Sequence, residues 1–165
     1  MRIGALVLSL LLAPQVSGAA AYAGMFAPEG CEFRMALPTD LTPDVSEWGG
    51  RRTVSVASDH GTYAIRAACT TGYPPGALAA LGSDRRLAFV ERLVAALDLA
   101  DARVSLGPEG NWVDVAGMLP ASTMHLRTRI VYGRSSRLMV EILSSDESKA
   151  NSGLNSVFSL VEFLR

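Results

Sequence analysis

The sequence predicts an α+β domain in which an antiparallel sheet of about six strands, arranged in two meanders, is packed by a central helix and a C-terminal helix. Short segments that alternate apolar and polar residues, separated by turn residues, indicate the strands. One segment of helical periodicity interrupts them at residues 83–98, and a second closes the chain. Strands that follow one another through short turns favour an antiparallel sheet with helices on its faces.

Residues 1–23 are typical of a cleavable secretory signal peptide. A short basic start, Met1-Arg2, precedes an apolar run at residues 3–13 and a small-x-small site at residues 21–23. The apolar run is shorter than the ~20 residues that cross a bilayer. We therefore expect a mature domain of residues 24–165, periplasmic or extracellular, with no stable membrane insertion after cleavage. Retention of the leader as an anchor stays an open alternative.

The composition favours one domain without a nucleic-acid partner. The chain has 165 residues, close to the size of a single domain once the leader is removed. Its 15 Lys and Arg against 16 Asp and Glu give a formal net charge of -1. A nucleic-acid-binding protein usually carries a basic surplus.

The two cysteines, Cys31 and Cys69, predict one structural disulfide. An even pair without further metal ligands is typical of proteins in an oxidising compartment. Closing a loop of roughly 38 residues stabilises a fold by about 4 kcal/mol on the chain-entropy model. The pair lacks the CxxC spacing of a redox or zinc site, and no cofactor is expected.

The first strands are expected in the N-terminal half of the mature chain. Residues 31–37 alternate and end at Pro38, residues 38–50 indicate an irregular connection, and residues 52–57 and 62–70 form a hairpin. For the disulfide to form, the first and third strands must be neighbours or near neighbours in the sheet. We expect both tryptophans, Trp48 and Trp112, to belong to the core.

A helix is predicted at residues 83–98, with Ser83 as its N-cap. Further strands are expected at residues 103–106 and 112–119. The clearest hairpin joins residues 124–132 to residues 137–143, because one side of each segment is apolar. The terminal helix is expected after Ser145-Asp146-Glu147 on the helical spacing of five apolar residues, Leu154, Val157, Phe158, Val161 and Leu164.

This order of elements resembles the PsbP-like α/β/α sandwich found in uncharacterised secreted bacterial proteins. The similarity covers most of residues 30–165 and includes three short patterns, Cys31-Glu32-Phe33, Gly133-Arg134-Ser135-Ser136-Arg137-Leu138 and Val157-Phe158. Members of that fold family mostly act as adaptors or accessory subunits. The resemblance therefore implies protein binding rather than catalysis.

Whether the protein is an enzyme stays open, with the sequence leaning against it. The two histidines, His60 and His125, fall in a predicted turn and at a strand end. Neither they nor the nearby serines, Ser58 and Ser122, stand in a nucleophile motif. Asp59-His60 and Asp146-Glu147 supply too few ligands for a metal site, so no catalytic or metal residue is assigned.

The candidate binding face consists of four arginines, Arg127, Arg129, Arg134 and Arg137. Strand alternation places the first two on one side of the predicted hairpin, and the turn brings the others towards its tip. We expect a non-catalytic binding or adaptor domain whose partner is a protein or another envelope component, bound by this face or by a sheet edge. The alternatives are an ordinary solvated sheet face and a small-ligand carrier or envelope enzyme with a pocket between the central helix and the sheet.

Overall fold

The computed structural model describes residues 24–37 and 41–164. The predicted signal peptide lies outside the described residues. Within them, no helix combines the length and the apolar character needed to cross a membrane.

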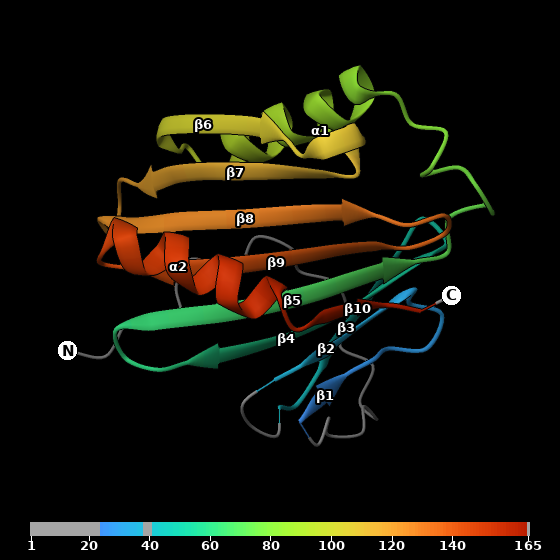
Figure 1. Ribbon diagram of the computed structural model, residues 1–165, viewed down its shortest axis with the longest axis horizontal. Helices are drawn as coiled ribbons and strands as arrows, with labels where there is room; N and C mark the ends of the chain where they lie inside the picture. Colours follow the sequence, from blue (N-terminus) through green and yellow to red (C-terminus); the bar gives the residue numbers. More distant parts are fainter. Residues whose placement is uncertain (1–23, 38–40, 165) are drawn as a thin grey trace.

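A seven-stranded antiparallel sheet forms the centre of the molecule, in the order β3-β4-β5-β9-β8-β7-β6 (Figure 1). Strands that follow one another in the chain are joined by short turns, apart from the longer connection between β5 and β6, which contains a helix. The strands are β3 (Asp44–Trp48), β4 (Arg51–Asp59), β5 (Tyr63–Thr71), β6 (Ala100–Leu106), β7 (Trp112–Leu119), β8 (Met124–Tyr132) and β9 (Arg137–Ser144). A short 3-10 turn, η1 (Pro108–Gly110), connects β6 to β7.

A second, three-stranded sheet combines the two ends of the described chain. Its order is β1-β2-β10, from β1 (Met25–Phe26), β2 (Phe33–Ala36) and β10 (Val161–Phe163). Both pairings are antiparallel, and β2 lies between the other two strands. The rings of Phe33 and Phe163 meet edge to face, with centroids 5.2 Å apart.

The helices cover opposite faces of the large sheet. α2 (Glu147–Phe158) packs on β8 and β9, and α1 (Ser83–Ala96) packs on β7 and β6. Side chains alternate between faces along a strand. Leu138 and Val140 of β9 therefore join the core beneath α2 and the small sheet, whereas Met139 joins the core beneath α1.

The structure confirms the α+β class, the antiparallel pairing and the two helices, and it corrects the layout of about six strands. Residues 44–48, expected in an irregular connection, form β3 at one edge of the sheet. Trp48 was predicted to be in the core, but it is 80% exposed because it ends this edge strand at a hairpin tip. Trp112 is half-buried against the core beneath α2.

Two helix boundaries also differ from the prediction. Gly82, rather than Ser83, is the N-cap of α1, and no side chain caps that helix. The last helix ends at Phe158, because residues 161–163 leave the helical path and pair with β2. Main-chain pairing with a distant strand thus overrides a local helical spacing.

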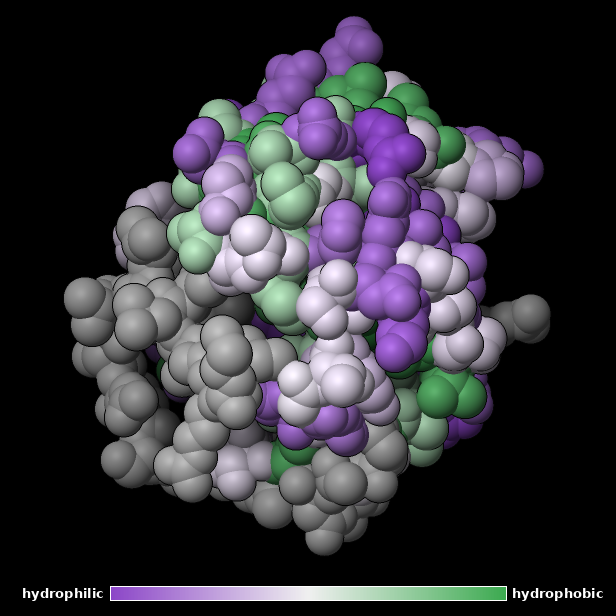
Figure 2. Space-filling model, turned by 90° about the vertical axis from the view of Figure 1, so that its left-hand side faces the viewer, coloured by the Kyte–Doolittle hydropathy of each residue, from purple (hydrophilic) through white to green (hydrophobic). Residues whose placement is uncertain are grey.

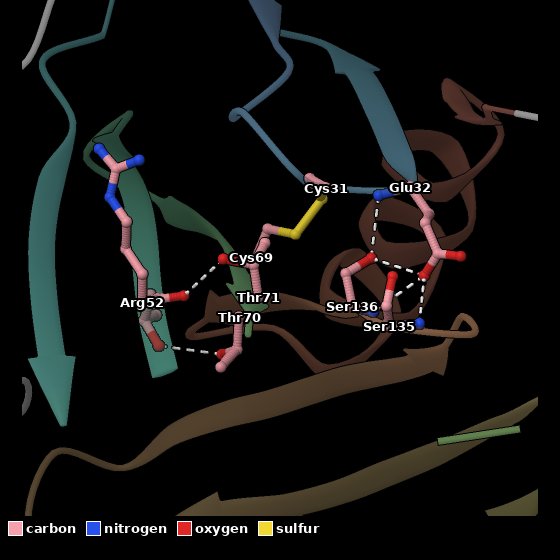
Figure 3. Close-up of a disulfide and its surroundings, with 9 residues drawn as sticks. Cys31, Glu32, Arg52, Cys69, Thr70, Thr71, Ser135 and Ser136 are labelled. Carbon is pink, nitrogen blue, oxygen red and sulfur yellow. Dashed lines mark hydrogen bonds between the residues drawn. A yellow bond between two sulfur atoms is a disulfide. The ribbon is translucent and has the colours of Figure 1, made fainter. Parts of the chain in front are cut away.

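The predicted disulfide between Cys31 and Cys69 is present, with a Cα–Cα distance of 6.3 Å. Its position differs from the expectation of two neighbouring strands. Cys31 precedes β2 of the small sheet and Cys69 lies in β5 of the large one, so the bond joins the two sheets (Figure 3). Both cysteines are buried.

Candidate functional site

The structure does not bring the four predicted arginines together on one face. Arg127 and Arg129 project from β8 towards α2, where they contact Glu147 and Phe158. Arg137 lies on the opposite face, with its guanidinium carbon 4.3 Å from the ring centroid of Phe89 in α1. Arg134 is exposed in the β8–β9 turn. Successive side chains alternate between the two faces of the sheet only along one strand. Arg137 belongs to β9, so the alternation along β8 does not determine its face.

Arg129 is held by an intramolecular ion pair. Its Nε and Nη2 each donate to an oxygen of Asp114 over 2.6 Å, the bidentate geometry of strong guanidinium–carboxylate pairs. The same guanidinium lies 5.2 Å from the ring centroid of Trp112. These contacts fix the orientation of the side chain, and the Asp114 carboxylate occupies the Nε–Nη2 edge of the guanidinium, at which an external anion would otherwise bind.

Arg127 forms a different arrangement with Arg103 and Glu147. Both guanidinium groups donate through Nη2 to one atom, the Oε1 of Glu147, and the Arg127 distance is 3.1 Å. The register explains the convergence: Arg103 of β6 and Arg127 of β8 both lie opposite Ala116 of β7. Because alanine is small, the two long side chains on either side of it can reach the same point.

These residues line a surface pocket of about 120 Å³ at the start of α2. Figure 2 views this end of the molecule and shows a band of hydrophilic residues along one side. The pocket is lined by Asp101, Arg103, Gly117, Met118, His125, Arg127 and Glu147. Asp101 belongs to an irregular stretch of β6, where the register with β7 shifts between Ala100 and Arg103.

In the pocket the carboxylate of Glu147 lies between two guanidinium groups, and Asp101 adds a second carboxylate to the lining. The hydrogen bond and charge of Arg103, followed by the charges of Arg127 and His125, hold the pKa of Glu147 below its ordinary value. Burial and the neighbouring charge of Arg103 lower the pKa of Arg127, and the charge of Glu147 offsets part of that effect. Glu147 therefore acts as an internal counter-ion that reduces the repulsion between the two arginines.

The histidines do not assemble a nucleophilic site. Ser58 Oγ and His60 Nε2 lie 2.9 Å apart in the β4–β5 turn, but both residues are exposed or half-exposed and His60 stacks on Tyr63. Asp59 accepts a hydrogen bond from the main-chain N–H of Gly61 instead of orienting the imidazole. His125 lines the arginine pocket. Residues 24–37 and 41–164 contain no cluster of three His, Cys, Asp or Glu side chains able to hold a metal ion.

The space between α1 and the sheet is filled by side chains. Leu87, Val90 and Val94 of the helix pack with Val113 and Val115 of β7. Another surface hollow, about 290 Å³, is lined by consecutive residues of one hairpin tip, 47–52. The pocket around Arg103 and Arg127 differs from it, because two strands and a helix contribute its charged groups.

No protein-family model matches the chain, and no curated protein matches it.

The predicted binding face included Arg127 but not Arg103 or Glu147, which line the same pocket. The position of Glu147 at the start of the predicted terminal helix indicated a structural role, because the helix dipole stabilises a carboxylate in the first turn. Arg103 lay in an expected strand. Their meeting depends on the pairing of three strands, which the linear pattern does not contain.

Proposed function

We propose that the protein is a secreted or periplasmic, non-catalytic binding domain that holds an anionic group of a protein or other envelope component between Arg103 and Arg127. The observation that carries the proposal is the convergence of two guanidinium groups on one carboxylate oxygen. A guanidinium has five N–H donors, and a carboxylate or phosphate can accept two of them at once. The Glu147 contact uses one nitrogen of each arginine.

Glu147 is suited to give way to an external anion. Its side chain is 46% exposed, whereas that of Arg127 is 18% exposed and the guanidinium is held near the sheet. An incoming anion would take the place of the Glu147 carboxylate between Arg103 and Arg127. The two arginines would therefore keep a negatively charged partner throughout. The cost of binding is then chiefly the release of Glu147 to water, and this cost is small because ion pairs of exposed groups contribute little to stability.

The compartment and the resemblance agree with this role. The Cys31–Cys69 bond fits an oxidising environment outside the cytoplasm. The PsbP-like fold that the sequence resembles is one that mostly serves adaptors and accessory subunits. Both considerations support binding to another component of the envelope.

The test is a titration of the mature protein with two probes, inorganic phosphate and a glutamate-rich peptide, in wild type and charge variants. Replacing Arg103 or Arg127 with Gln should weaken binding by tenfold or more, because a hydrogen bond to a charged group contributes about 1.5–3 kcal/mol. Replacing Glu147 with Gln should strengthen binding, because both arginines lose their internal counter-ion. General attraction to positive charge predicts the same two directions, so a control variant that removes an arginine outside the pocket is needed to distinguish a defined site from it.

Arg85→Gln is the matched control, since Arg85 is an exposed arginine of α1 outside the pocket. It should leave the affinity for both probes unchanged. Equal losses in the Arg85 and Arg127 variants, or weaker binding by Glu147→Gln, would contradict the proposal. In the native envelope, mild cross-linking of tagged wild type should recover a stoichiometric partner that the Arg103 and Arg127 variants lose.

A further inference from the structure

The outer side of β6 is open. β6 is one of the two edge strands of the large sheet, and its residues 101–106 are all exposed. Val104 and Leu106 are 38% and 40% exposed. Main-chain groups on the free side of an edge strand can pair with a further strand, and apolar side chains at that edge favour such pairing.

The ladder with β7 shows which main-chain groups are free. The N–H of Gly107 donates to the carbonyl of Trp112 over 2.9 Å, continuing the register in which Leu106 lies opposite Val113. Residues that bond to the neighbouring strand alternate with residues that face away from it. Arg103 and Ser105 therefore direct their main-chain groups to β7, and Val104 and Leu106 direct theirs outwards.

The side chains of Val104 and Leu106 extend the apolar core beneath α1 to the edge of the sheet. Val104 and Leu106 lie opposite Val115 and Val113 of β7, which are fully buried beneath α1. Among the described residues, no further strand pairs with this edge. β6 carries its two charges, Asp101 and Arg103, at one end of the exposed stretch, whereas Asp44 and Glu47 flank the middle of the other edge strand, β3, on both sides and oppose pairing there.

We infer that β6 pairs antiparallel with β6 of a second copy of this chain, about a two-fold axis at Ser105. In this register Val104 lies opposite the partner's Leu106, and each such pair exchanges both of its main-chain hydrogen bonds. The four apolar side chains form one row on the face of α1. Arg103 lies opposite the partner's Gly107, so the paired residues 103–107 contain no like-charged contact. The bulge between Ala100 and Arg103 ends the pairing.

The interface is short, and the dimer should dissociate on dilution. A paired segment of this length buries well under the ~1,000 Å² expected of a stable interface. The two large sheets become continuous, and both arginine pockets lie on the same face. Pairing through β6 depends on the free main-chain groups and apolar side chains of this strand, and it does not require the arginine pockets to bind anions.

The decisive experiment is oxidation of a Ser105→Cys variant. Residues directly opposite at a non-hydrogen-bonded position have Cα atoms about 4.5 Å apart, close enough for a disulfide. The variant should form a covalent dimer joined through position 105, identified by peptide mapping, with Cys31–Cys69 intact. Ser46→Cys on the other edge strand is the matched control and should remain monomeric. Equal cross-linking of the two variants, or none in either, would overturn the inference.

Sedimentation of the protein without added cysteine provides the second measurement. Wild type should shift from dimer to monomer over a dilution series. Leu106→Lys should be monomeric throughout, whereas Trp48→Lys, a control at another exposed apolar position, should behave as wild type. Thermal unfolding of each variant verifies the fold. A monomeric wild type at every concentration, or an unchanged Leu106→Lys, would refute pairing through β6.

Discussion

The carboxylate of Glu32 is expected to be one of the principal polar contributors to stability. It accepts hydrogen bonds from the main-chain N–H groups of Ser135 and Ser136, both at 2.8 Å, and from the Ser136 hydroxyl at 3.0 Å (Figure 3). The main-chain N–H of Arg134 donates a further bond over 3.1 Å. The Ser136 hydroxyl in turn accepts from the N–H of Glu32. One side chain therefore ties the β8–β9 turn to the segment that carries the disulfide.

Replacing Glu32 with Gln should lower the free energy of unfolding by about 1.5–3 kcal/mol at neutral pH, the contribution of hydrogen bonds to a charged group. The amide can accept some of these bonds but carries no charge, and its NH2 group faces donors. Urea denaturation measures the change, with Glu29→Gln as an exposed control. Gly133→Ala should be destabilising for a separate reason, because its Cβ would stand 2.3 Å from Glu32 Oε2.

The pH dependence provides the stricter test. Burial raises the pKa of Glu32, but hydrogen bonds from Ser135, Ser136 and Arg134 outweigh it and hold the pKa below its ordinary value. A lowered folded-state pKa adds stability above the unfolded-state pKa, and this stability is lost as the pH falls through the folded-state pKa. The gap between wild type and Glu32→Gln should therefore narrow below about pH 4.3. A gap that is independent of pH, or absent at neutral pH, would refute the reasoning.

Three further results are expected. Changing Cys31 and Cys69 together to Ser should lower the free energy of unfolding by about 4 kcal/mol in urea, and wild type with reductant should match it. Leu138→Ala, at a fully buried position, should cost about 2–5 kcal/mol, whereas exposed Leu160→Ala should stay within about 0.5 kcal/mol in the same assay. The carboxyl of Glu141 should titrate above 4.5 by NMR, because burial raises its pKa and a neighbouring guanidinium only partly offsets this. Its contribution to stability then decreases as the pH rises from the unfolded-state pKa through the folded-state pKa.

Local sequence patterns predicted the strands and helices that pack mainly against elements adjacent to them in the sequence. The β8–β9 hairpin follows the expected alternation closely, since Leu126, Thr128 and Ile130 are all buried on one face. β3 was missed because an edge strand contacts the core on few sides and tolerates charges such as Glu47. A polar segment of that kind resembles a loop in sequence.

Long-range pairings explain the remaining errors. Val161 fits the spacing of the preceding helix, yet it pairs with Met35. The arginine pocket has the same origin, because Arg103 and Arg127 meet through their shared position opposite Ala116. The sequence shows which residue types are present, and the register of strands decides which of them converge.

The position of β2 between β1 and β10 has a consequence for the order of events during synthesis. β10 follows every strand of the large sheet in the chain, and Leu164 donates its N–H to the carbonyl of Glu32 over 2.8 Å. One side of β2 therefore has no partner until residues 161–163 have been synthesised and have left the path of the preceding helix. The large sheet can assemble before them, whereas the small sheet closes only once they are in place. Loss of residues 161–163 would leave an open strand edge beside the disulfide, a feature that proteases and chaperones recognise in incompletely folded proteins.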